Sequence, residues 1–158
     1  AQRLRELLTP AASIVCIGGE LSGDDAAGVA VAERLAGSIP WRLFNTQTAP
    51  ESFLMKIVAG EPDLLILIDA LDFGAEPGTV ELLRAEGLTG QGPSTHGPAP
   101  MMFLEALRMM HPVDVWFLGV QPQHVRPGVA MSDPVTRAVE LIVRAFQIAS
   151  GAAPTGGS

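Results

Sequence analysis

Three polar side chains stand where a parallel sheet would gather them, and their types suit a metal ion. Asp25 lies in a glycine-rich stretch after one apolar run, Asp69 ends the most apolar run of the chain, and His96 lies in a polar loop before a helical pattern. Two carboxylates and one imidazole form a ligand set that fits a divalent transition metal with open coordination positions. No local metal motif such as H-E-x-x-H is present, so this prediction depends on the three loops converging.

Each of these residues also has a simpler structural explanation. Asp24 and Asp25 could cap the following helix and complement its dipole, and both roles could hold, with Asp24 capping and Asp25 facing a cleft. A carboxylate on a buried strand is costly to desolvate, so we expect Asp69 to be paired, hydrogen-bonded or bound to a cation. Asp72 is the better candidate for an Asx turn. A lone loop histidine such as His96 is often only solvated.

Other catalytic sets are weaker. The glycine-rich stretch 18–28 lacks the Lys and Ser/Thr of a phosphate-binding loop, and no G-x-S-x-G motif is present. Cys16 lies inside an apolar run, where a thiol usually behaves as a small buried hydrophobe. His111 precedes a proline and indicates the end of a helix, whereas His124 has no assigned role. The paired methionines at 101–102 and 109–110 are expected to fill the core.

Alternating strand and helix patterns predict the framework that would position these residues. The segment 70–77 is too short for a parallel crossover, so the strand after it is expected to be an antiparallel edge. We therefore predict a three-layer, doubly wound α/β fold with a mostly parallel five-stranded sheet, one antiparallel edge strand and helices on both faces. The expected strands are 13–18, 41–45, 63–69, 78–83 and 113–120, and the expected helices are 24–36, 50–58, 98–110 and 134–148.

Length and composition exclude several classes of protein. The 158 residues, 47% of them hydrophobic, suit one core, and we expect a loosely attached lead-in at 1–12, a single α/β domain at 13–149 and a disordered tail at 150–158. A net charge of -7 without a basic stripe argues against nucleic acid. One cysteine excludes a disulfide framework and favours the cytoplasm.

The longest apolar run, 64–68, is far below the ~20 residues of a membrane helix, so no membrane insertion is expected. The sequence shows no long apolar helix face that would have to be buried against a second subunit, so we expect a monomer.

Five motifs resemble one family in their order and spacing. They are GGELSGDDAAG (18–28), TAPE (48–51), LLILIDALDFGAEPGTVELL (64–83), STHGPAP (94–100) and FLGVQP (117–122). The chain is thereby similar, over about 14–146, to the maturation endopeptidases of nickel-iron hydrogenases, most closely those serving formate-hydrogenlyase-type enzymes. This resemblance implies an α/β peptidase domain that cuts a short C-terminal extension from the hydrogenase large-subunit precursor after nickel insertion.

The resemblance also implies roles for residues. The family's metal-contacting positions fall on Asp25, Asp69 and His96, the same three residues whose side-chain types suit a metal ion. Nickel would arrive on cysteine thiolates of the substrate, so no tightly held cofactor is expected. The cleavage would be of the aspartic type, with Asp25 or Asp69 as general base, or the metal would polarise the scissile carbonyl. Two departures stand out: Gly18-Gly19 replaces the family's Gly-Asn pair, and Thr46-Gln47 stands where a glycine pair commonly ends the second strand.

Two other functions fit the same residues. A non-catalytic, metal-binding chaperone would hold the large subunit without cutting it, and the acidic cleft and Met-rich helix would serve that role as well. A small-molecule hydrolase in the same fold would act without a protein partner. Measuring the mass of the precursor before and after incubation separates a protease from a chaperone, because only a protease removes mass.

Overall fold

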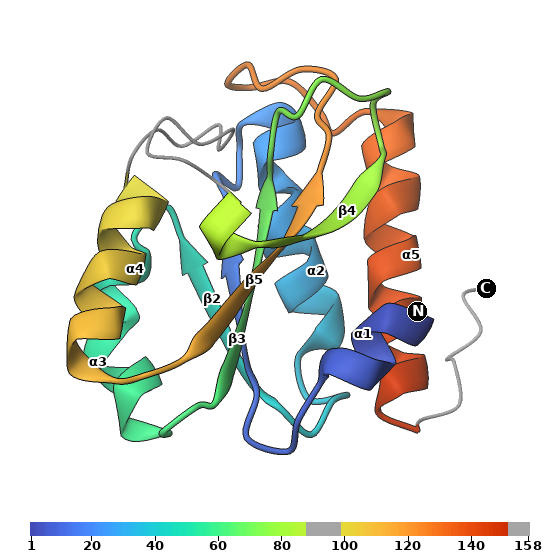
Figure 1. Ribbon diagram of the computed structural model, residues 1–158. Helices are drawn as coiled ribbons and strands as arrows, with labels where there is room; N and C mark the ends of the chain where they lie inside the picture. Colours follow the sequence, from blue (N-terminus) through green and yellow to red (C-terminus); the bar gives the residue numbers. More distant parts are fainter. Residues whose placement is uncertain (88–98, 152–158) are drawn as a thin grey trace.

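The most apolar run of the chain forms the central strand of the sheet. This strand, β3 (Leu64–Ala70), has all of its residues buried, as a strand covered on both faces should. The computed structural model describes residues 1–87 and 99–151 and places the strands in the order β2-β1-β3-β5-β4 (Figure 1). The other strands are β1 (Ser13–Ile17), β2 (Arg42–Gln47), β4 (Val80–Arg84) and β5 (Asp114–Val120).

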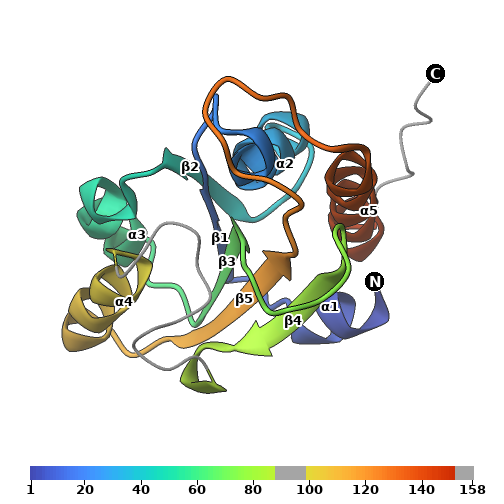
Figure 2. The same ribbon diagram turned by 90° about the horizontal axis from the view of Figure 1, so that it is seen from above.

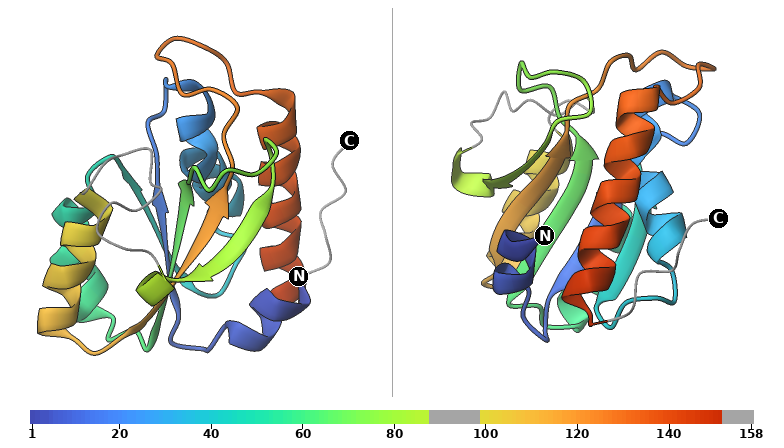
Figure 3. Two further views of the ribbon diagram at one scale, coloured as in Figure 1. Left: turned by 45° about the horizontal axis from the view of Figure 1, so that its top comes forward. Right: turned by 90° about the vertical axis from the view of Figure 1, so that its right-hand side faces the viewer.

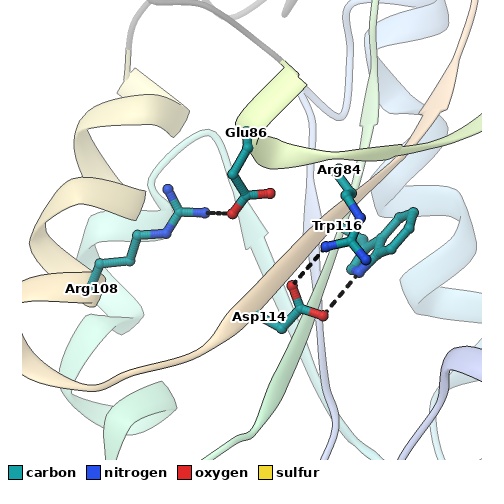
Figure 4. Close-up of polar contacts among 5 residues, drawn as sticks. All are labelled: Arg84, Glu86, Arg108, Asp114 and Trp116. Atoms are coloured by element: carbon teal, nitrogen blue, oxygen red, sulfur yellow. Dashed lines mark hydrogen bonds and ion pairs between the residues drawn. The ribbon is translucent and has the colours of Figure 1, made fainter.

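Strand β4 forms the predicted antiparallel edge. It pairs antiparallel with β5, whereas the β1–β2, β1–β3 and β3–β5 pairs are parallel. Side chains hold this edge to β5: the Arg84 guanidinium lies 4.6 Å from the centroid of the Trp116 ring and 4.0 Å from Asp114 Oδ1 (Figure 4). The short connection 71–79 leaves no room for a parallel crossover, so the predicted topology is confirmed.

Helices cover both faces of the sheet, as predicted. On one face lie α2 (Ala27–Leu35) and α5 (Asp133–Ala149), and on the other α3 (Leu54–Ala59) and α4 (Ala99–Met110) (Figure 2). Alternation along β3 divides the core in the same way. Ile66 and Ile68 belong to the cluster under α2 and α5, and Leu65 and Leu67 to the cluster under α3 and α4. Asp69 follows Ile68, so the alternation puts it on the α3 and α4 side.

A glycine lets α2 sit directly on the ends of two strands. A Cβ atom added to Gly28 would lie 2.2 Å from the backbone oxygen of Ile17 and 2.8 Å from that of Ile68. Any side chain here would push the helix away from β1 and β3. The residues just before α2 form a 3-10 turn, η1 (Gly23–Ala26), so the predicted helix at 24–36 starts in a tighter turn than expected. Gly28 thereby fixes η1 beside the carboxyl end of β3.

The N-terminal lead-in is helical and anchored, in contrast to the loose attachment that we expected. It contains α1 (Gln2–Leu7), which contacts α5 (Figure 3). Leu4 is 5% exposed and belongs to the core cluster under α5. The indole nitrogen of Trp41 donates a hydrogen bond of 3.0 Å to the backbone oxygen of Thr9. Of the expected tail, residues 152–158 lie outside the described part of the chain.

Three of the four methionines of α4 (Met102, Met109 and Met110) do not fill the core as predicted, whereas Met101 is partly buried and packs against the core cluster under α4. Phe103, Leu104 and Leu107 face the sheet, whereas Met102 is 65% and Met109 is 89% exposed. Two further 3-10 turns, η2 (Pro50–Phe53) and η3 (Ala85–Gly87), precede α3 and follow β4. Within residues 1–87 and 99–151, no helix has the length and apolar character needed to cross a bilayer.

Candidate active site

Asp25 and Asp69 come to the same edge of the sheet. Asp69 is fully buried near the carboxyl end of β3, and Asp25 lies in η1 with 8% exposure. The turn η1 contacts β3, and Gly28 rests on the backbone oxygen of Ile68, the neighbour of Asp69. The edge lies where the strand order reverses between β1 and β3, the point at which doubly wound folds bind ligands.

The third predicted ligand, His96, lies outside the described residues. The elements on either side of that segment are joined by an ion pair, in which Arg108 of α4 donates to Glu86 of η3 at 2.9 Å (Figure 4). Among residues 1–87 and 99–151, no group of three His, Cys, Asp or Glu side chains is arranged to hold a metal ion. The three-residue metal set therefore stays a prediction, of which two members share one edge.

Asp24 anchors the loop that follows β5. Its side chain is fully buried. It accepts hydrogen bonds from the backbone N–H groups of Gln123 at 2.7 Å, His124 at 3.1 Å and Ser132 at 2.7 Å. The hydroxyl of Ser132 adds contacts of 3.0 and 2.9 Å to the two carboxylate oxygens. One carboxylate thus joins η1 to the residues that lead into α5.

These hydrogen bonds also set the charge state of Asp24. Burial acts to raise the pKa of this carboxyl, but the backbone N–H groups of Ser132, Gln123 and His124 and the Ser132 hydroxyl outweigh burial and lower the pKa below its usual value. Asp24 makes no capping hydrogen bond to η1 or α2, so the capping role that we expected for it is wrong. Its partners lie about one hundred residues further along the chain.

A second buried side chain holds the loop that follows β3. Gln121 is 6% exposed, and its Oε1 accepts the backbone N–H groups of Phe73 at 2.8 Å and Ala75 at 3.2 Å. Its Nε2 donates to Asp72 Oδ1 at 3.1 Å. The same Asp72 oxygen accepts the N–H of Gly74 at 3.2 Å, which confirms the predicted Asx turn. The loop after Asp69 is therefore fixed to the end of β5.

The remaining candidates have structural roles. Cys16 is fully buried, and burial raises the pKa of its thiol, as expected for a small hydrophobe. His111 follows α4 and its Nε2 lies 2.9 Å from the backbone oxygen of Pro62, in agreement with a helix end. Where the family commonly has glycines, the Thr46 hydroxyl donates to the backbone oxygen of Cys16 at 3.0 Å. Gln47 adopts a φ of 50°, which is a left-handed conformation that glycine takes more readily.

Comparisons with known proteins agree on one family. The family model described as hydrogenase maturation protease matches residues 29–147. The hydrogenase 3 maturation protease of Escherichia coli K12 is 29% identical over 136 residues, which span 85% of this chain and 87% of that protein.

Solved structures agree in fold. The solution structure of an endopeptidase HycI from Escherichia coli has a TM-score of 0.77 at 27% identity, covering 89% of this chain and 92% of that one. The crystal structure of a [NiFe] hydrogenase maturation protease HycI from Thermococcus kodakarensis has a TM-score of 0.80 at 24% identity, covering 94% of this chain and 99% of that one. Because the family model spans most of the described sheet and helices, the chain belongs to the hydrogenase maturation protease family.

Proposed function

We propose that the protein is an endopeptidase that removes the C-terminal extension of the nickel-loaded [NiFe]-hydrogenase large-subunit precursor. The observation that carries this proposal is the position of Asp25 and Asp69 on one edge of the sheet in a chain of this family. Both carboxylates lie on a rigid frame, since Gly28 and Asp24 fix η1 and β3 is the central strand. A pair of fixed carboxylates can bind a cation and activate water.

Nickel would belong to the substrate. The only cysteine of this chain, Cys16, is fully buried inside β1, so sulfur ligands for the metal would come from the precursor. Asp25, Asp69 and His96 would add oxygen and nitrogen ligands. A precursor without nickel would then lack the group that these residues bind, and it would not be cut. The metal would thereby license cleavage of a correctly loaded precursor.

The chemical step needs a base. Water attacks the scissile carbonyl carbon, the C–N bond breaks, and the amine of the released extension takes a proton. Either Asp25 or Asp69 would accept the proton from water. The nickel of the substrate could also polarise the carbonyl. Separate Asp25→Asn and Asp69→Asn variants decide which carboxylate is the base, because loss of a general base lowers kcat by about a hundredfold or more.

The test is incubation of the purified protein with nickel-loaded precursor, followed by mass spectrometry of the precursor. We expect the wild-type protein to remove a C-terminal fragment and the Asp69→Asn and His96→Ala variants to lose this activity. Asp114→Asn, at the opposite end of the sheet, is the matched control and should keep it. Processing at wild-type rate by both site variants would refute the assignment.

The same experiment distinguishes the alternative functions. A chaperone would bind the precursor and leave its mass unchanged, and a small-molecule hydrolase would neither bind the precursor nor shorten it. We propose that the reaction takes place in the cytoplasm, because a chain with one cysteine and no disulfide framework suits a reducing compartment. We also propose a monomer, which light scattering of the purified protein would test.

A further inference from the structure

One apolar side chain near the candidate site is unusually exposed. Leu21 is 78% exposed, and among the large apolar side chains of the described residues only Met109 exceeds it. Leu21 lies in the glycine-rich motif 18–28, four residues before Asp25. The function proposed above uses Asp25 from this motif and leaves Leu21 without a role.

Leu21 lines a groove beside η1, which we name the Leu21 groove. It has a volume of about 560 Å³ and lies between η1 and α2 on one side and residues 128–131 on the other. Val29, Val129 and Met131 contribute further apolar lining. Val129 is itself 36% exposed. Exposed apolar side chains gathered in a groove are typical of a surface that binds a partner.

The walls of the groove are rigid. The N–H of Gly128 donates to the backbone oxygen of Leu21 at 2.8 Å, and the N–H of Asp24 donates to that of His124 at 3.0 Å. The buried carboxylate of Asp24 holds the same two segments together. These hydrogen bonds fix the backbone around Leu21, and its side chain is exposed to solvent from that fixed position. A preformed surface costs less conformational entropy when it binds.

The groove is negatively charged. Glu20 and Glu33 line it, and its lining contains no Lys, Arg or His among the described residues. Neither glutamate forms an ion pair within residues 1–87 and 99–151. A partner that fits this surface would present an apolar side chain to Leu21 and a Lys or Arg to the two carboxylates.

The groove and the candidate site share one turn of backbone. Gly23 and Ala26 of η1 line the groove, and Asp25 lies between them in the sequence. We propose that the Leu21 groove docks an apolar, basic segment of the substrate precursor next to the bond that is cut. This inference rests on the function proposed above. It adds a substrate-binding surface that is separate from the carboxylates.

The test compares cleavage kinetics of the full-length variants on nickel-loaded precursor. We expect Leu21→Ser to raise KM about tenfold and to leave kcat within about twofold, because it removes the most exposed apolar side chain of the groove, which binding would bury. Glu33→Lys should raise KM several-fold, with an effect that shrinks at high salt. Met109→Ser and Glu140→Lys, which remove an exposed methionine on α4 and an exposed glutamate on α5, are the matched controls and should behave as wild type.

Affinity for immobilised precursor, measured by biolayer interferometry, separates the two proposals. Wild-type KM and affinity in Leu21→Ser and Glu33→Lys would overturn the docking site and leave the protease function intact. If the wild-type protein binds the precursor without shortening it, the protease function fails, and a tenfold weaker affinity of Leu21→Ser would still support the groove. Equal affinities, or no binding by the wild-type protein, would overturn the groove. Leu21 is exposed, so Leu21→Ser should keep the wild-type melting temperature, which circular dichroism checks.

Discussion

Removing the carboxylate of Asp24 should destabilise the fold strongly. Asp24→Ala leaves four donor groups without their acceptor: three backbone N–H groups and the Ser132 hydroxyl. A hydrogen bond to a charged group contributes about 1.5–3 kcal/mol. Gln123 is exposed and His124 half-buried, so water can replace the acceptor there, whereas Ser132 is buried. Counting the two donors of Ser132 alone, we expect the free energy of unfolding to fall by about 3–6 kcal/mol.

The same carboxylate should make stability depend on pH. The folded state lowers the pKa of Asp24 below the value of about 3.9 for an unfolded aspartate. Its stabilising effect is therefore complete above the unfolded pKa and is lost as the pH falls through the folded pKa. Asp24→Asn has no titrating group at this position. The difference in free energy of unfolding between wild type and Asp24→Asn should stay constant near neutral pH and shrink below about pH 4.

Urea unfolding followed by circular dichroism measures both effects. Wild type, Asp24→Ala and Asp24→Asn are compared at pH 7 and at steps down to pH 3, with Glu140→Gln on the exposed face of α5 as control. The control should differ from wild type by less than about 0.5 kcal/mol at pH 7. A loss below about 1 kcal/mol for Asp24→Ala at pH 7, or a gap to Asp24→Asn that does not change with pH, would refute the reasoning.

Three further substitutions or measurements test the local structure. Gly28→Ala should cost about 3 kcal/mol of unfolding free energy in a urea titration, although alanine favours helices, because its Cβ would meet the backbone oxygen of Ile17 at 2.2 Å; a gain in stability would contradict the close contact. Gln47→Gly should raise the unfolding free energy by about 0.5 kcal/mol, because glycine adopts the φ of 50° without strain; a loss above about 1 kcal/mol would speak against strain there. Cys16 is buried and its thiol pKa is raised, so a thiol reagent should label it only in denaturant, and rapid labelling of the native protein would contradict this burial.

The architecture could be predicted because its signals are local and strong. The run 64–68 is apolar throughout, as expected of a strand that is buried on both faces. Its short connection to β4 excludes a parallel partner. Carboxyl ends of parallel strands meet at one edge, so the approach of Asp25 and Asp69 followed from their places in the pattern. Helix α1 was missed because its six residues bury only Leu4, too little for an amphipathic pattern.

The role of Asp24 could not be read from the sequence. An acidic pair before a helix fits a local cap, and nothing near Asp24 indicates another partner. The donors that it accepts lie at 123, 124 and 132, and only the folded chain brings them to η1. Tertiary hydrogen bonds to a buried charge outweigh a capping bond at an exposed helix end. The predicted metal set of Asp25, Asp69 and His96 is only partly visible in the structure, because His96 lies outside the described residues. The place of His96 beside the two carboxylates stays a prediction.

One short segment connects the two carboxylates of the candidate site. Residues 121–124 follow β5, and Gln121 binds the loop after Asp69 through Asp72, Phe73 and Ala75. Two residues later, the backbone of 123–124 binds Asp24, the neighbour of Asp25. Because both loops are tied to one segment, the separation of Asp25 and Asp69 depends on it as well as on Gly28. The motif FLGVQP at 117–122 therefore contributes to the site by positioning, although no side chain in it is an acid, a base or a metal ligand.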